Sequence, residues 1–145
     1  SDGLLKMNEA GYKGRKNQKG FLAYDKNGNK IREKANSKVY DFFGNPTKKK
    51  FIASEIQLRL SLLMINEAVV CLEDGIIESV EDGDIGAIFG IGFRPFTGGP
   101  FRYIDSVGAS NIVSDLNRLK DAYGNRFTPS QLLNKHAEKT IKFYK

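Results

Sequence analysis

The sequence predicts a mainly α-helical protein, with a helical domain at residues 51–145 preceded by a short β-hairpin and loop segment at residues 1–50. Apolar residues recur at helical spacing through the second segment, whereas the first contains a glycine-punctuated loop, an aromatic run and an Asn-Gly pair. The charge also changes between them: residues 1–50 hold 13 Lys/Arg against 5 Asp/Glu, and residues 51–145 hold 10 against 12. We therefore expect one main domain with a smaller unit attached.

The first segment is predicted to contain a hairpin. Residues 11–20 form a basic loop with three glycines, and an aromatic run at 21–25 follows as a strand. Asn27-Gly28 is the strongest local signal for a turn, so residues 30–34 supply the return strand. Residues 37–43 then favour a helical turn, and residues 44–50 a solvated linker.

The first long helix is expected at residues 55–74, because Ser54 and Gln57 have the spacing of a capping box and Gly75 ends the run. Apolar residues cover most of its circumference, so we place it in the middle of a helical bundle. These are Ile56, Leu60, Leu63, Met64, Ala68, Val70 and Cys71. The narrow polar stripe comprises Glu55, Arg59, Asn66 and Glu73, of which Glu55 and Arg59 have the spacing of a helical ion pair.

Capping signals define the remaining helices. Ser79 begins a helix that runs to about Gly90, and the acidic residues at 81, 82 and 84 suit the positive dipole of its first turn. Pro100 suits the first position of a short helix that Gly108 ends. A fourth helix spans 109–123, and Thr128 caps the last helix, with Pro129 at its first position.

Composition excludes several classes of chemistry. One cysteine, Cys71, precludes an internal disulfide and favours a reducing compartment, and its apolar neighbours predict core packing. One histidine, His136, removes most acid–base and metal schemes and suits a helix C-terminus. No apolar run is long enough to span a membrane. The N-terminus has no signal core, which we interpret as a sequence that begins within a longer protein.

Two motifs resemble ligand sites, but each has an unsuitable residue at one essential position. The acidic cluster at 78–84 is no EF-hand, because Phe93 stands where the bidentate glutamate belongs. Gly90-Ile91-Gly92 is no dinucleotide fingerprint, because Pro95 takes the third glycine position. We expect no catalytic residue, no cofactor-binding residue and no metal ligand in this chain.

Three stretches together resemble one family. Residues 14–24, Gly-Arg-Lys-Asn-Gln-Lys-Gly-Phe and then Tyr24, resemble the end of the C-terminal domain of 3-hydroxyacyl-CoA dehydrogenases. Residues 59–68, from Arg59 to an Asn-Glu-Ala run, resemble the core helix of the same domain. Residues 82–105, which end in Gly-Gly-Pro-Phe-Arg-Tyr-Ile-Asp, resemble its most specific signature. The end of one such domain thus precedes the start of another.

This order is similar to that of the alpha subunits of fatty-acid oxidation complexes, which carry two helical C-terminal domains in tandem. The resemblance implies the non-catalytic C-terminal part of a β-oxidation enzyme whose full chain hydrates enoyl-CoA and oxidises 3-hydroxyacyl-CoA with NAD. Its partners would be the upstream domains of the same chain, the acyl-CoA substrate and a thiolase subunit. It would act in the bacterial cytoplasm, or in a mitochondrion or peroxisome of a eukaryote.

The resemblance also assigns roles to residues. The structural signature would comprise Arg59, Asn66, Glu67, Phe93, Gly98, Gly99, Pro100, Phe101 and Asp105. We expect Phe93, Phe96 and Phe101 to be buried, and Asp105 to cap a neighbouring backbone or pair with Arg102. The candidate contacts for coenzyme A phosphates are Lys13, Arg15 and Lys16.

Two positions depart from the family pattern. Leu58 stands where active copies of the domain have an asparagine that faces the active site, so this copy is expected to form none. Arg94 replaces the usual proline in the signature loop. Two other classes stay open: a basic nucleic-acid-binding domain, since Tyr12, Phe21 and Tyr24 lie among lysines, and a free-standing helical interaction module.

Overall fold

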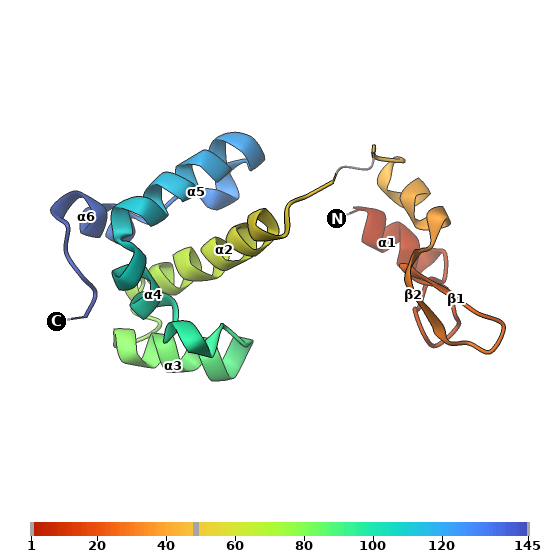
Figure 1. Ribbon diagram of the computed structural model, residues 1–145, viewed down its shortest axis with the longest axis horizontal. Helices are drawn as coiled ribbons and strands as arrows, with labels where there is room; N and C mark the ends of the chain where they lie inside the picture. Colours follow the sequence, from red (N-terminus) through yellow and green to blue (C-terminus); the bar gives the residue numbers. More distant parts are fainter. Residues whose placement is uncertain (1, 48–49, 145) are drawn as a thin grey trace. The chain divides into compact units, whose positions relative to one another are not determined.

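The protein is mainly helical, with a short antiparallel hairpin near its N-terminus, as the sequence predicts. The computed structural model describes residues 2–47 and 50–144 (Figure 1). The chain divides into two compact units, Ser1–Lys50 and Phe51–Lys145. None of the described helices is both long and apolar enough to cross a membrane.

The first unit contains two helical elements and the hairpin. Helix α1, Asp2–Glu9, was not predicted from the sequence, and it packs on the 3-10 helix η1, Ser37–Phe43. Gly3 permits this packing, because a Cβ there would overlap the ring of Phe43. Strands β1, Leu22–Tyr24, and β2, Lys30–Ala35, pair antiparallel, as the Asn-Gly turn predicts.

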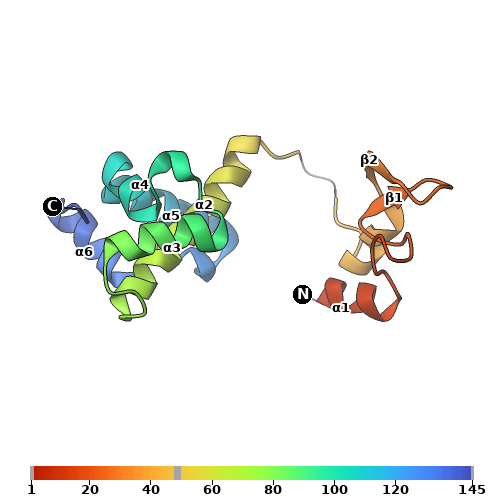
Figure 2. The ribbon, with the colours of Figure 1, turned by 90° about the horizontal axis from the view of Figure 1, so that it is seen from below.

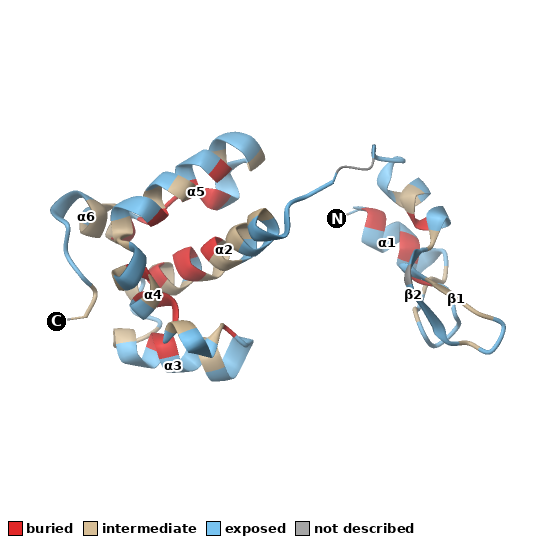
Figure 3. Ribbon diagram, in the orientation of Figure 1, coloured by how far each residue is buried: buried red, intermediate tan, exposed pale blue. Residues whose placement is uncertain are grey.

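The second unit is built around helix α2, Ala53–Glu73, which contacts α3, Val80–Ile91, α4, Pro100–Val107, α5, Ala109–Tyr123, and α6, Gln131–Lys139 (Figure 2). Two short 3-10 helices complete it: η2, Pro95–Thr97, and η3, Asn125–Phe127. The buried positions follow the inner faces of the helices (Figure 3). The apolar core comprises Leu62, Ile65, Val69, Phe93, Phe101, Ile104, Ile112, Leu116, Leu119, Phe127 and Leu133.

Two predicted helix starts are wrong. Helix α2 begins at Ala53 after Ile52, so Ser54 lies inside the first turn and caps nothing. Helix α6 is capped by Ser130, whose hydroxyl accepts a hydrogen bond from the Leu133 N–H, and not by Thr128. The Ser79 cap is confirmed, because its hydroxyl oxygen accepts a hydrogen bond from the Asp82 N–H at 3.1 Å.

Helix α2 lies at the centre of the second unit, as expected, but the described part of the chain covers its apolar circumference only in part. Its buried residues are Leu62, Ile65, Asn66 and Val69. Ile56 and Leu60, predicted as part of its apolar circumference, are exposed. The core stripe is therefore narrower than the apolar pattern, and the second unit retains an uncovered apolar face.

Candidate functional site

Gly99 of the signature loop lies against a buried carboxylate. Asp84 on α3 is almost fully buried and accepts hydrogen bonds from the N–H groups of Phe101, at 2.7 Å, and Arg102, at 3.3 Å. These N–H groups belong to the first turn of α4, where a carboxylate is favoured by the helix dipole. Asp84 therefore caps α4, not the first turn of its own helix as predicted.

Gly99 makes this contact possible. Its φ is +111°, and a Cβ at this position would overlap the Asp84 carboxyl group. The side chain of Asp84 also accepts a hydrogen bond from the Tyr144 hydroxyl at 2.8 Å. Burial raises the pKa of Asp84 against the opposing effect of these hydrogen bonds, and burial with the nearby carboxylate raises the pKa of Tyr144 to about 12.

Asp105 fixes the C-terminal segment. Its two carboxylate oxygens accept hydrogen bonds from the N–H groups of Phe143 and Tyr144, both at 2.8 Å. The first of the two predicted roles, backbone capping, is thus the one the structure contains. Arg102 instead lies over the ring of Tyr144, with its guanidinium carbon 3.7 Å from the ring centroid. The ring of His136 stacks on Phe143 at the end of α6, where a histidine was expected.

Asn66 holds the segment that leads into α6. Its amide nitrogen donates to the Thr128 carbonyl at 3.0 Å, and its amide oxygen accepts from the Ser130 N–H at 2.9 Å. Asn66 is buried, and satisfying both ends of its amide removes most of the cost of that burial. This signature residue therefore positions a loop.

Arg59 and Glu55 meet at Tyr123 and not at each other. The Tyr123 hydroxyl donates to Glu55 at 2.6 Å, which raises the pKa of Tyr123, and the Arg59 guanidinium lies 3.8 Å above the same ring. Among the described side chains the ion pair is Arg118 with Asp115, so the predicted Glu55–Arg59 pair is absent there. Both residues pin α5 to α2.

The signature loop departs from expectation at two positions. Phe93 and Phe101 are buried as predicted, but Phe96 is 85% exposed, because η2 turns it away from the core. Arg94 lies with its guanidinium 4.7 Å from the centroid of the Tyr103 ring. Its Nε and Nη2 atoms are buried and have no hydrogen-bond partner among the described residues. The stacked ring is the partner of this charge.

An apolar groove of about 720 Å³ runs between α2 and α3. Its walls are mostly apolar, and Glu67, Asp82 and Arg126 supply the charges at its border. Cys71, predicted to be a core residue, is half-buried and lines this groove. The lining residues are Leu63, Met64, Glu67, Ala68, Cys71, Ile77, Asp82, Gly83, Gly86, Ala87, Ile91 and Arg126.

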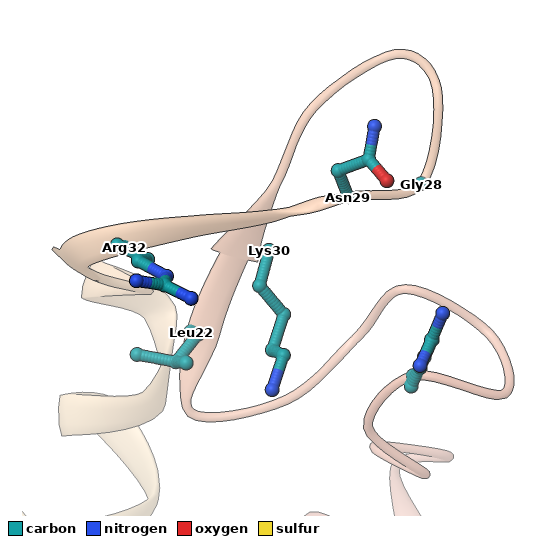
Figure 4. Close-up of a pocket in the computed structure, with 6 residues that line it drawn as sticks. Leu22, Gly28, Asn29, Lys30 and Arg32 are labelled. Carbon is teal, nitrogen blue, oxygen red and sulfur yellow. The ribbon is translucent and has the colours of Figure 1, made fainter.

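A second hollow, of about 290 Å³, lies in the first unit and is bordered by positive charge (Figure 4). Arg15, Lys30 and Arg32 line it together with Leu22 and the Gly28-Asn29 turn. Of the three residues proposed from the sequence as phosphate contacts, only Arg15 is in this lining. Lys13 and Lys16 are exposed elsewhere on the loop. Lys30 and Arg32 were missed, although alternate positions of a basic strand share one face.

The Gly90-Ile91-Gly92 motif forms the end of a helix. Gly90 and Ile91 end α3, and Gly92 is its C-cap with φ +72°, so this motif does not open a helix N-terminus as a dinucleotide loop would. The described residues contain no group of three His, Cys, Asp or Glu side chains placed to hold a metal ion.

No known protein-family model matches this chain. The resemblance to the dehydrogenase family therefore stays a prediction from its motifs. Most of the signature residues hold helices, loops or the C-terminal segment in place. The α2–α3 groove and the basic hollow of the first unit are two concave surfaces open to a partner or a ligand.

Proposed function

We propose that this chain is the non-catalytic C-terminal part of a fatty-acid β-oxidation enzyme, and that its second unit packs against a homologous helical domain through the α2–α3 face. The full chain would hydrate enoyl-CoA and oxidise 3-hydroxyacyl-CoA, with NAD and the catalytic groups held by domains upstream of residue 1. The bacterial cytoplasm and an associated thiolase subunit belong to the same proposal.

The observation that carries the proposal is the exposed apolar surface of α3. Seven successive residues at 85–91 carry no charge, yet Ile85 is 57% exposed, Phe89 85% and Ile91 67%. A helix this apolar is normally covered on all sides. A large patch of exposed apolar side chains is typical of a protein–protein interface. The α2–α3 groove lies beside this face and extends it.

Small residues on the same face suit close packing of another helix. An added Cβ at Gly86 or Gly90 would meet nothing within 4 Å, so both positions are open, and they are four residues apart on one side of α3. Gly86 also lines the groove. A partner helix could therefore approach the α3 backbone between Ile85 and Phe89.

A homologous helical domain is the occupant that the sequence favours. Residues 14–24 resemble the end of such a domain, which places a first copy immediately upstream in the proposed full chain. Three signature residues have a structural role: Asn66 and Asp105 hold backbone segments in place, and Gly99 makes room for Asp84. Signature residues that hold the fold in this way fit a domain whose role is to support its neighbour.

The decisive experiment uses the full-length chain from the source reading frame. Phe89→Lys introduces a charge into the proposed interface on α3. Phe96→Lys is the matched control, because Phe96 is equally exposed but lies on η2 and not on α3. We expect Phe89→Lys to lower the unfolding temperature and the yield of folded enzyme, and Phe96→Lys to leave both unchanged. Equal behaviour of the two variants, or a reading frame without an upstream helical domain, would refute the proposal.

The isolated chain tests the non-catalytic role separately. Calorimetric titration with NADH should show no saturable binding, and the chain should turn over no 3-hydroxyacyl-CoA. Micromolar binding of NADH to the isolated chain would overturn this part of the proposal.

A further inference from the structure

The basic hollow of the first unit has features of a ligand site that the packing role of the second unit does not use. We infer that the hollow lined by Arg15, Lys30 and Arg32 binds the phosphate group of a small molecule. Three cationic side chains border a volume of about 290 Å³, and among the described residues no carboxylate forms an ion pair with any of them. An anion in this hollow would relieve the repulsion between like charges.

The hairpin places two of the three cations on one face. Lys30 and Arg32 are two residues apart on β2, and alternate residues of a strand project to the same side (Figure 4). Leu22 on β1 supplies the apolar part of the lining. The spacing of the two cations is therefore set by the strand and does not depend on a flexible loop.

The third cation comes from a loop that is itself held in place. The side-chain oxygen of Asn17 accepts hydrogen bonds from the N–H groups of Lys13 and Lys19, both at 3.3 Å. The Gly14 N–H donates to the Lys19 carbonyl at 2.7 Å and closes the loop. Arg15 lies inside this closed segment, so ordering it against a ligand costs less entropy than ordering a free loop.

The loop and the hairpin turn are in contact. Gln18 lies so close to Gly28 that a Cβ added to Gly28 would be 2.7 Å from Gln18 Nε2. This contact brings the loop of Arg15 beside the turn that completes the lining of the hollow. The three cations thus belong to one local structure within the first unit.

Asp25, the carboxylate of the hairpin turn, is already engaged in hydrogen bonds. Asp25 accepts hydrogen bonds from the N–H groups of Asn27, at 2.8 Å, and Asn29, at 2.9 Å. These bonds, that from Asn29 above all, lower the pKa of Asp25, so it is ionised and committed to its own turn. Asp25 does not line the hollow.

Phosphate is the anion that this set of donors suits best. Two guanidinium groups can each donate paired hydrogen bonds to phosphate oxygens, and Lys30 adds a point charge. The volume is at the lower limit of small-molecule sites, so it accommodates a phosphate-bearing end and not a whole large ligand. No lining residue is aromatic, which argues against stacked nucleic-acid bases. If the proposed function holds, the source of the phosphate is the nucleotide end of coenzyme A.

The test uses the whole 145-residue chain and two phosphate probes. Adenosine 3′,5′-bisphosphate, the nucleotide part of coenzyme A, and inorganic pyrophosphate are titrated at low ionic strength while the backbone amide signals of Gly28 and Asn29 are followed by NMR. The lining variant combines Arg15→Gln with Arg32→Gln. The matched control combines Lys13→Gln with Lys16→Gln, which removes the same charge from the same unit outside the lining.

We expect saturable shifts at the two turn amides. Each exposed charge contact is worth about a 2- to 5-fold change in affinity, so the lining variant should bind roughly 4- to 25-fold more weakly. The control should change affinity less than about 2-fold. If the bisphosphate binds more tightly than pyrophosphate, the source of the phosphate is the nucleotide. If the two probes bind equally, the phosphate site stands and its ligand is a phosphate group without a nucleotide.

Two results would overturn the inference. Equal weakening by the lining and control variants would mean that the basic unit attracts anions without a site. A single-stranded oligonucleotide that binds more tightly than either probe, with both variants weakened alike and a steep dependence on salt, would assign the surface to nucleic acid. Neither result depends on the α2–α3 face, so failure here is distinguishable from failure of the proposed domain packing.

Discussion

Gly99→Ala should destabilise the second unit by removing the room that a buried carboxylate needs. Gly99 has φ +111° and ψ 176°, a backbone conformation that residues other than glycine rarely adopt. A Cβ there would also overlap the carboxyl group of Asp84, which accepts hydrogen bonds from the N–H groups of Phe101 and Arg102. The substitution therefore combines backbone strain with displacement of a buried anion.

The two contributions can be separated with a control at Gly124. This residue has nearly the same backbone conformation, φ +96° and ψ 179°, but a Cβ there would meet nothing within 4 Å. Gly124→Ala should cost only the strain, about 1–3 kcal/mol. Gly99→Ala should cost about 1.5–3 kcal/mol more, the value of a charge-assisted hydrogen bond lost from a buried group.

Thermal and urea unfolding measure the free energy of unfolding that each of the two variants loses. For a unit of roughly 100 residues, a difference of about 2 kcal/mol corresponds to a gap of roughly 8–16 °C between their unfolding temperatures. The double variant with Asp84→Ala should make the cost of Gly99→Ala approach that of Gly124→Ala, because the overlapping group is gone. Equal destabilisation by the two single alanine variants would refute the reasoning.

Three further outcomes are expected from the signature and the C-terminal segment. Phe101→Ala should lower the free energy of unfolding by about 3–5 kcal/mol, as measured in urea, because the ring is fully buried. Asp105→Asn should cost about 1.5–3 kcal/mol and speed hydrogen exchange at the Phe143 and Tyr144 amides, while unchanged exchange would exclude the cap. The folded protein holds the Tyr144 phenol proton more tightly than the unfolded chain, whose pKa is near 10, so stability should fall as pH rises from 10 towards 12. Tyr144→Phe should reduce that fall and remove the contribution of one tyrosine from the phenolate absorbance change above pH 10.

Local signals in the sequence were sufficient where one element determines the structure. The Asn27-Gly28 turn, the Ser79 cap and the glycines at 108 and 124 fix chain direction through their own backbone preferences. Ser54 and Ser130 show the limit of that approach. Both are good caps in isolation, but the direction from which the chain enters each helix decides which of them is used, and that direction depends on packing.

The basic hollow of the first unit could be only partly predicted from the sequence. Arg15 was identified because it lies in a basic run, whereas Lys30 and Arg32 join it only when the loop packs against the hairpin turn through Gln18 and Gly28. Helix α1 was missed because a helix this short gains little stability from its own hydrogen bonds and depends on burial against η1.

The sequence by itself determined the helical class of residues 51–145, the hairpin before them and the motifs on which the family prediction rests, because periodicity and turn chemistry are properties of neighbouring residues. Tertiary structure alone decided that Asp84 serves α4 and Tyr144, that Asp105 holds the C-terminal segment, and that Phe96 faces water. It also decided that α3 stays exposed. These outcomes depend on which distant groups meet, and burial strengthens or penalises a polar group only after its partners have been brought to it.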